Sequence, residues 1–484
     1  MALPPRVDGW GLAPLMNGME TAMWRMDSDA ALRTDVVMIW TLDRMPEWDR
    51  FLACCAWLTR VLPRLRLRVV EPPLRIGWPV WEVDEEFDLA CHVRRARLPS
   101  PGGRRELLDL AESVSASVFD PARPPWRAVL VEQVDKGEGN EAGPAAIVIK
   151  LHHCLADGAG LRQAMMALLP RSRRASLRPL GPPPELPRHA SPWRLSARAM
   201  ASGFSGAPGR AGRRGIRMAE DLARVSAAPA AVPVKLTRLA RSLQQTAAIP
   251  RGSALLAGRS RERRFTAVEM PLAELKAAGK HADASVTAAF ITVLLGAFSD
   301  YHRHRGWAGD SMSVVVPVNV RNNERTNGNN IVGGLLLGAP LREMDTRERL
   351  TSMGAILRQA RQSPLAGWTS ALTTLIPLAP LPVLLRAARY MGGAHDLTAS
   401  SVPGVPYQAY IAGARLTSSL VFGPRAYGAC TAVLMSQDET LGLGLNVDPM
   451  AITDVPLFDR LVHENAERVL ALASSARPAP LART

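Results

Sequence analysis

The chain is 484 residues long, which exceeds the usual size of one hydrophobic core and predicts two domains. Its hydrophobic content of 47% excludes wholesale disorder, and its five scattered cysteines form no metal-binding or redox spacing and are typical of a reducing compartment. The net charge of +15 comes from one segment, because residues 171–264 hold 20 Lys and Arg against 4 Asp and Glu. The N-terminus does not resemble a secretion signal, and no apolar run reaches the roughly 20 residues that a membrane-spanning helix needs.

Residues 1–170 are predicted to form a first domain that mixes strands and helices. Apolar runs and alternating patterns predict strands around Trp40 and Leu42 and at 63–70, within 87–97, at 126–132 and at 145–151. Helices are expected at 49–62 and 104–117, and Leu161, Met165 and Leu168 recur at helical spacing after the last strand.

Residues 171–262 are predicted to be a basic linker that is rich in Pro, Ala and Arg and partly helical. In a helix expected at 234–245, Leu236, Leu239 and Leu243 share one face among basic residues. Such a helix can lie on an anionic membrane surface or dock on its own protein, and a solvated linker is an equally good interpretation of the charge. The segment has few aromatic residues, which argues against binding of nucleic acid.

Residues 263–484 are predicted to form a second domain of the same class. Strands are expected at 265–270, 311–320, 331–337, 409–416, 430–436 and 441–447, and helices at 272–278, 285–301, 346–362 and 458–473. The apolar run from Val286 to Phe298 is short for a membrane span and is interpreted as a core helix. Strands and helices mixed in both halves predict two α/β domains.

Residues 150–160, KLHHCLADGAG, group several chemically active side chains at the end of a predicted strand. His152 and His153 are followed by Asp157 and Gly158, and loops held by a rigid frame are where function concentrates. A histidine with an ordinary pKa of about 6.5 can take a proton at neutral pH and return it. Asp157 can orient such a ring or hold the loop through an arginine, and Gly158 permits a backbone angle that turns the acid inward.

Other interpretations of this motif stay open. A histidine in a short motif is often structural, and a metal site made by His153 and Asp157 is weaker still because no HExxH or CxxC cluster accompanies it. Cys154 is explained by its small apolar side chain as well as by any reactivity. The chain has no G-x-S-x-G elbow, since the nearest match at 203–207 lacks the last glycine. A histidine base without a nucleophile suits direct transfer, in which a deprotonated hydroxyl attacks an activated acyl group.

An ordered set of further motifs accompanies the histidines at 63–66, 87–89, 92–95, 98–99, 123–126, 318–321, 328–329, 400–404, 412–414 and 448–449. Together they resemble the bacterial wax ester synthase/diacylglycerol acyltransferase family, which belongs to the group that shares folds with chloramphenicol acetyltransferase and peptide-synthetase condensation domains. The likeness covers roughly residues 12–170 and 250–475. The ordered set is far more specific than any one of its motifs.

The resemblance implies an α/β fold of two chloramphenicol-acetyltransferase-like domains, each a mixed β-sheet flanked by helices, with an active-site tunnel at their interface. The implied catalytic residues are His153 as general base, His152 in support of the loop, and Asp157, which is mainly structural and is expected to pair with Arg321. The site would be supported by Gly158, Arg321 and Asn319. Residues expected near the substrates are Pro124, Trp126, Gly328, Asn329, Val402, Pro403 and Gly404.

The implied reaction moves a fatty acyl group from acyl-CoA to a long-chain alcohol or diacylglycerol, giving wax ester or triacylglycerol. Acyl-CoA is a substrate, and neither a metal nor another cofactor is expected. The expected partners are therefore the two substrates and an anionic membrane or lipid-droplet surface, without nucleic acid. The expected location is cytoplasmic, on the inner face of the cell membrane or on lipid droplets.

The chain also departs from the family's pattern. Thr287 and Ala288 stand where the family has Asn and Asp, Ser401 replaces an Asn, and Pro125 replaces the Leu beside Trp126. Loss of an Asn that ties loops together should loosen their geometry. Because the histidine motif is intact, we expect altered substrate preference rather than loss of activity.

Two alternative functions remain from the sequence. The first is a condensation-type acyltransferase that takes its acyl group from a carrier protein or another donor in specialised metabolism. The second is a non-catalytic lipid-binding protein on the same fold. Substitution of His153 separates them, because lipid binding would survive it and turnover would not.

Overall fold

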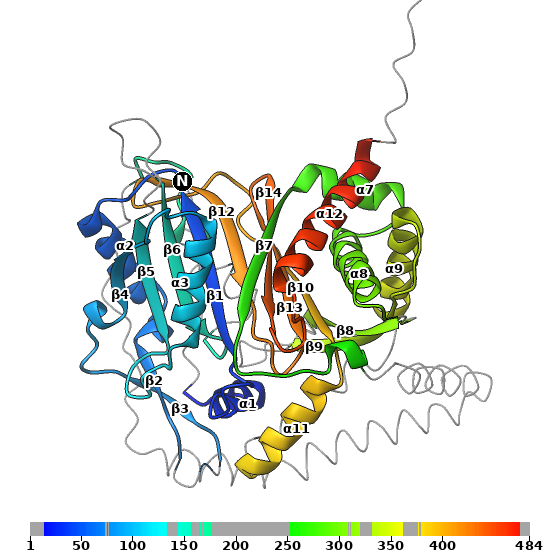
Figure 1. Cartoon of the computed structure of the whole chain (residues 1–484). Helices are drawn as coiled ribbons and strands as arrows, with labels where there is room; N and C mark the ends of the chain where they lie inside the picture. Colours follow the sequence, from blue (N-terminus) through cyan, green and yellow to red (C-terminus); the bar gives the residue numbers. More distant parts are fainter. Residues whose placement is uncertain are drawn as a thin grey trace, which may run out of the picture.

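The computed structural model describes residues 14–72, 75, 77–132, 144–155, 162, 165–166, 168–175, 252–307, 309, 311–319, 332–361, 376 and 379–474. Two six-stranded mixed sheets lie side by side, and helices cover their outer faces (Figure 1). The molecule is therefore mixed α/β with sheets flanked by helices, as the sequence predicts. The linker helix expected at 234–245 lies outside the described residues.

The first sheet has the strand order β11-β12-β1-β6-β5-β4. Its strands are β11 (Tyr410–Ile411), β12 (Ala414–Phe422), β1 (Asp35–Leu42), β6 (Ala145–His152), β5 (Trp126–Glu132) and β4 (Val93–Arg97). Strand β6 lies between β1 and β5 and is antiparallel to both, whereas β4 and β5 are parallel. The strand that ends at the histidine pair is thus held on both sides.

The second sheet has the strand order β7-β14-β13-β10-β8-β9. Its strands are β7 (Arg264–Pro271), β14 (Thr440–Val447), β13 (Cys430–Gln437), β10 (Leu397–Val402), β8 (Ser311–Asn319) and β9 (Val332–Pro340). Strand β10 is parallel to both β13 and β8, so these three strands end at the same edge of the sheet. Asn319 and Val402, the last residues of β8 and β10, therefore lie at one edge of the sheet.

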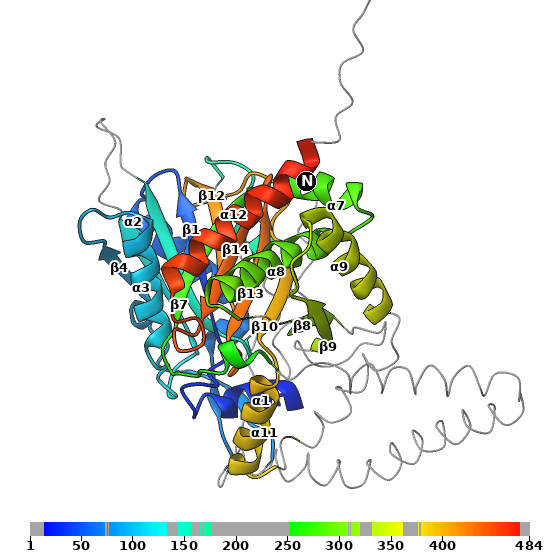
Figure 2. The same cartoon turned by 45° about the vertical axis from the view of Figure 1, so that its right-hand side comes forward.

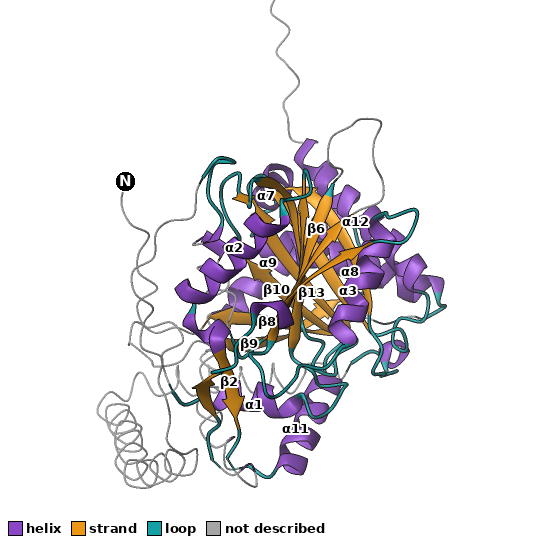
Figure 3. Ribbon diagram, turned by 90° about the vertical axis from the view of Figure 1, so that its left-hand side faces the viewer, coloured by secondary structure: helices purple, strands orange, loops and turns teal. Residues whose placement is uncertain are grey.

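The helices are α1 (Gly18–Met26), α2 (Trp48–Val61), α3 (Arg104–Ala116), α7 (Leu272–His281), α8 (Val286–His304), α9 (Thr346–Arg361), α11 (Leu381–Gly393) and α12 (Val455–Ser474). Helices α8 and α12 pack against each other beside the second sheet (Figure 2). Helix α3 contacts β1 and β6 of the first sheet and β7 of the second. Strands fill the centre of the molecule with helices around them (Figure 3).

Two strands from the C-terminal half complete the first sheet. Chain segments before residue 170 form β1, β4, β5 and β6, and those after 263 form the second sheet. Strand β12, however, returns to pair with β1, and β11 pairs with β12 at the edge of the first sheet. Residues 409–416, expected as one strand, form the short strand β11, a turn and the start of β12. Phe422 of β12 stacks on Phe265 of β7 at 4.2 Å between ring centroids, in a core cluster that also holds side chains of α3. The two halves therefore share a core.

The strands and helices predicted from strong apolar patterns agree best with the structure. The strands expected at 126–132 and 145–151 are β5 and β6, and the core helix expected from Val286 is α8, in which every residue from Ala288 to His302 is buried. Residues 63–70, expected as one strand, form a 3-10 turn (Pro63–Arg66) followed by β2 (Leu67–Val70). Strand β2 pairs with β3 (Val80–Val83) as a hairpin.

No single helix among the described residues is long and apolar enough to cross a membrane. Helices α7 and α8 reach that length and composition only as a pair, and the chain bends by 92° between them.

Candidate active site

The histidine pair lies at the end of β6 and is fixed there by both neighbouring strands. The N–H of His152 donates to the carbonyl of Pro125 at 3.0 Å, and the N–H of His153 donates to the carbonyl of Thr34 at 3.1 Å. These bonds continue the antiparallel ladders, in which His152 faces Asp35 and Leu151 faces Trp126. The backbone of the motif is therefore rigid up to the start of its loop.

The His152 side chain is fully buried and is held by neighbouring groups of the protein. Its Nε2 lies 3.2 Å from Oδ2 of Asp27 and 3.2 Å from Oγ1 of Thr34, and its ring lies against Trp24 of α1. The N–H of Cys154 donates to Nδ1 at 3.1 Å. Since Nδ1 is an acceptor, the ring proton is assigned to Nε2, where it faces the carboxylate.

The Asp27 carboxylate is well suited to hold this ring. Burial alone would raise the pKa of Asp27, but the His152 ring and the hydrogen bonds from the Thr34 N–H and hydroxyl outweigh it, so the pKa lies below its usual value. A charged carboxylate that fixes a histidine tautomer from behind is a familiar support for a neighbouring functional loop. No motif in the sequence marks Asp27 or Thr34, and neither was among the expected site residues.

His153 is the more accessible member of the pair. It is half-buried and directly follows β6, and the alternation of side chains along that strand predicts that it points to the side of Leu151. Asp157 and Gly158, the other motif residues, lie outside the described residues, as do Arg321, Gly328 and Asn329. The expected pairing of Asp157 with Arg321 therefore stays a prediction.

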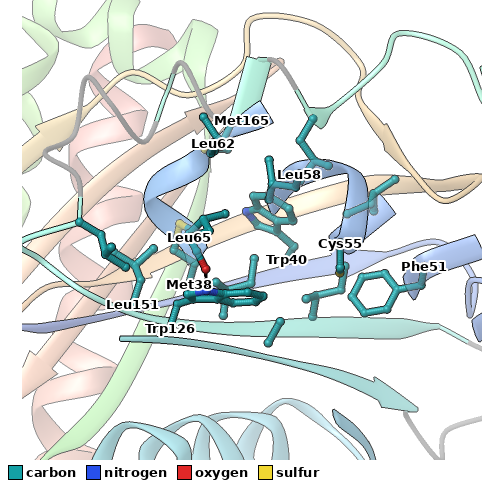
Figure 4. Close-up of a pocket in the computed structure, with 16 residues that line it drawn as sticks. Met38, Trp40, Phe51, Cys55, Leu58, Leu62, Leu65, Trp126, Leu151 and Met165 are labelled. Atoms are coloured by element: carbon teal, nitrogen blue, oxygen red, sulfur yellow. Dashed lines mark hydrogen bonds between the residues drawn. The ribbon is translucent and has the colours of Figure 1, made fainter. Parts of the chain in front are cut away.

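A cavity of about 100 Å³ lies against the same side of β6 (Figure 4). Three alternate residues of β6, Ile147, Ile149 and Leu151, form one wall, and α2 closes the cavity from the other side with Cys55 and Leu58. All of the residues that line it are apolar: Met38, Trp40, Phe51, Cys55, Leu58, Leu62, Leu65, Trp126, Ala128, Ile147, Ile149, Leu151, Leu155, Met165, Leu168 and Ile411. A wall without polar side chains suits a hydrocarbon chain.

Trp126 connects the cavity to the upstream motifs. Its indole N–H donates to the carbonyl of Leu65 at 2.8 Å, so its one polar group is satisfied. His92 stacks on the Trp126 ring at 4.6 Å and on Phe87 at 5.1 Å, and Nδ1 of His92 lies 2.9 Å from the Trp126 carbonyl oxygen. The motifs at 63–66, 87–89, 92–95 and 123–126, which are far apart in the sequence, thus meet around one indole ring. Pro124 is buried next to Trp126, and its carbonyl accepts from the backbone N–H of Trp126 at 2.9 Å.

The motif at 400–404 approaches the histidine loop from the second half of the chain. Arg162, which follows the loop, donates from Nε to the Gly404 carbonyl at 3.3 Å. Val402 packs against the core cluster of the first sheet, whereas Pro403 is exposed. A Cβ at Gly404 would lie 1.9 Å from the Ser436 carbonyl oxygen, so only glycine fits here. Asn319 ends β8 at the same edge of the sheet as this motif.

A buried ionic cluster supports β6 on the face opposite the cavity. Asp35 accepts from Arg263 at 3.0 and 3.2 Å and from the Ser115 hydroxyl at 2.6 Å. Lys150 donates to the carbonyls of Ser115 and Ser117 at 2.9 and 2.5 Å. Burial lowers the pKa of Lys150 to about 8, although Asp35 acts in the opposite direction. Arg263 comes from the start of the second half, so this cluster also joins the two halves.

Within the part of the chain that the structure describes, no group of three or more His, Cys, Asp or Glu side chains could hold a metal ion. The five cysteines are free thiols, and burial raises the pKa of Cys154, which disfavours its reactive thiolate. The described groups at this site are thus a histidine pair at the end of β6 and an apolar cavity beside that strand.

Comparison with known families adds to this geometry. The wax ester synthase/diacylglycerol acyltransferase catalytic domain matches residues 16–290, and the C-terminal domain of the same family matches residues 328–467. A Mycobacterium tuberculosis protein provisionally named a diacylglycerol O-acyltransferase is 30% identical over 97% of this chain and 94% of its own length. A second protein of that organism with the same provisional name is 25% identical over 88% of this chain and 89% of its own length.

Solved structures share the architecture. The wax ester synthase/diacylglycerol acyltransferase from Marinobacter aquaeolei VT8 superposes with a TM-score of 0.61 at 20% identity, covering 96% of this chain and all of that one. The first condensation domain of the CDA synthetase superposes with a TM-score of 0.53 at 14% identity, covering 96% and 98% of the two chains. Identities this low establish the common fold and nothing further.

Proposed function

The chain belongs to the wax ester synthase/diacylglycerol acyltransferase family, and from this premise we propose that it moves a fatty acyl group from acyl-CoA to the hydroxyl of diacylglycerol or a long-chain alcohol. The products would be triacylglycerol or wax ester. The provisional names of the mycobacterial relatives favour diacylglycerol as the acceptor.

The observation that supports this proposal is that the strand directly before the expected general base also lines the apolar cavity. Strand β6 contributes three side chains to the apolar cavity and ends at His152, directly before His153. A fatty chain held along this strand would bring its polar end toward the histidine. An apolar enclosure also keeps water from the thioester, which water would hydrolyse.

In the proposed reaction, His153 accepts the proton of the acceptor hydroxyl while the oxygen attacks the thioester carbonyl carbon. The carbon–oxygen bond forms, the carbon–sulfur bond of the tetrahedral intermediate breaks, and the proton passes from His153 to the CoA sulfur. His152 holds the start of the loop through Asp27 and Thr34 and does not meet substrate, because its ring is fully buried. Asp157 would shape the rest of the loop. The reaction as written needs no metal and no further cofactor.

The acceptors in this proposal are barely soluble in water, so the enzyme would work at a surface where they collect. We place it in the cytoplasm, on the inner face of the cell membrane or on lipid droplets. The basic segment 171–264 would strengthen attachment to anionic lipid, in a salt-dependent manner.

The test is release of free CoA from palmitoyl-CoA by the purified full chain, with dipalmitoylglycerol, with hexadecanol and without acceptor. We expect release that depends on an acceptor, with matching amounts of ester by mass spectrometry and a preference for diacylglycerol. Folded protein that makes no ester with either acceptor would contradict the proposal. Ester formation from a carrier-bound acyl group alone would favour the condensation-type alternative.

A further inference from the structure

Helix α11 presents an apolar face to solvent. Val383, Tyr390 and Met391 are 59%, 74% and 68% exposed, which is unusual for large hydrophobic side chains. Together with Arg386 and Ala387, which are also exposed, they follow the spacing i, i+3, i+4, i+7 and i+8, which places all five residues on one side of a helix.

The opposite side of α11 is firmly held. Leu384 is buried, and Gly392 lies so close to the Ala426 carbonyl oxygen that a Cβ there would approach it to 2.1 Å. Arg389 forms an ion pair with Asp29, with 2.6 Å between Nε and Oδ2. The exposed face therefore belongs to a helix with a fixed position, not to a loosely attached segment.

The charge of α11 complements an anionic surface. Leu381–Gly393 contains two arginines and no Asp or Glu, and Arg386 lies on the exposed face between the apolar side chains. Apolar and aromatic side chains beside a cation are typical of helices that lie in the headgroup region of a bilayer. Three large side chains on a helix of 13 residues offer far less area than the roughly 1,200 Å² that a stable protein interface buries.

We propose that α11 is the element that docks this protein on an anionic phospholipid surface. The role of this docking rests on the proposed function, since the acceptors collect in such a surface. The exposed side chains and charges from which it is inferred do not depend on that function. Val383, Tyr390 and Met391 enter the lipid, and Arg386 pairs with phosphate groups at its edge.

Helix α11 lies near the end of β6 that precedes the histidine loop. Helices α1 and α11 lie side by side at the end of the molecule where β1 begins and β6 ends (Figures 1 and 2). Asp29, the partner of Arg389, lies two residues after Asp27, the partner of His152. Docking through α11 therefore brings the end of β6 that carries the histidine pair toward the bilayer, which shortens the path of a lipid acceptor into the site.

The test is co-sedimentation of the full chain with phosphatidylcholine vesicles that contain either no phosphatidylglycerol or 30% of it. We compare wild type with Met391→Asp and Arg386→Glu. Met450→Asp is the matched control, because Met450 is 58% exposed on the turn after β14. Wild type should bind the anionic vesicles, Met391→Asp should lower the partition coefficient at least about tenfold, and Met450→Asp should leave it unchanged. Arg386→Glu should weaken binding to anionic vesicles most.

Three results would overturn the proposal: Met391→Asp binding like wild type, an equal loss in Met450→Asp, or a wild-type dimer that Met391→Asp converts to monomer in light scattering. Turnover of palmitoyl-CoA with dissolved hexanol separates this inference from the proposed function. The α11 variants should turn over palmitoyl-CoA with dissolved hexanol at the wild-type rate. With diacylglycerol embedded in vesicles, their turnover should fall below that of wild type. Vesicle binding through α11 by a protein without any turnover would leave the docking intact and remove the proposed function.

Discussion

The buried pair of Asp35 and Arg263 should be among the most sensitive features of this molecule. The Asp35 side chain is 1% exposed and that of Arg263 9%, and the pair joins β1 to the start of the second half of the chain. Asp35→Asn keeps the size of the side chain but removes its charge. It leaves the Arg263 guanidinium, and the Lys150 ammonium nearby, buried without their carboxylate.

Removing one partner of a buried ion pair costs about 3–5 kcal/mol, because the remaining charge stays desolvated. We expect a loss of this size in Asp35→Asn. The matched control is Asp43→Asn, whose partner Arg173 is more than a third exposed, and there we expect no more than about 1 kcal/mol. The double variant Asp35→Asn with Arg263→Met should lose less than the sum of the two single variants, since it no longer leaves a lone charge.

The assay is urea unfolding followed by circular dichroism at pH 7, with the m-value checked for each variant. A loss below about 1 kcal/mol in Asp35→Asn, or one equal to that of Asp43→Asn, would refute the reasoning. Additive losses in the double variant would show that the two charges do not depend on each other.

Three further outcomes follow from the described contacts. The pKa of Lys150 is about 8 in the folded chain and 10.5 in the unfolded chain. Between these values the unfolded chain binds more protons than the folded chain, so the free energy of unfolding should rise with pH, by about 2 kcal/mol from pH 8 to pH 10. Lys150→Met should flatten that rise in urea unfolding, and an unchanged slope would contradict the assignment. Cys55→Phe should fill the cavity and so disfavour long chains: kcat/KM for palmitoyl-CoA or hexadecanol, relative to that for their eight-carbon analogues, should fall by about tenfold. Cys91→Phe, at a residue that does not line the cavity, should leave this ratio unchanged. Gly404→Ala should destabilise by at least about 2 kcal/mol in thermal unfolding because of the Ser436 carbonyl, whereas Gly393→Ala, with no contact below 3.7 Å, should be nearly neutral.

The sequence predicted those parts of the fold whose signals are local. Strand β5 and strand β6 are apolar runs bounded by turn residues, and α8 is a long apolar run behind a serine cap at Ser285. Strand β10, LTASSV, was missed because half of its residues are small and polar, so its pattern does not favour a strand. Helix α1 was missed although Asn17 and Glu20 form a capping box at its start.

Long-range pairing explains most of what the sequence did not predict. Nothing local indicates that β12 leaves the second half to pair with β1, since register between distant strands depends on the whole fold. The same holds for Asp27, which reaches His152 across 125 residues of sequence. By contrast, Trp126 was among the expected substrate residues, and it lines the apolar cavity.

The most direct test of the central claim is the rate of ester formation by His153→Ala, with palmitoyl-CoA and whichever acceptor wild type uses. Removal of a general base lowers kcat by about 10²–10⁴-fold. His153 lies after the end of β6 and is only half-buried, so the variant should fold normally by circular dichroism. We expect a loss in this range with an unchanged unfolding midpoint. A folded His153→Ala variant that forms ester within about threefold of the wild-type rate would contradict that claim.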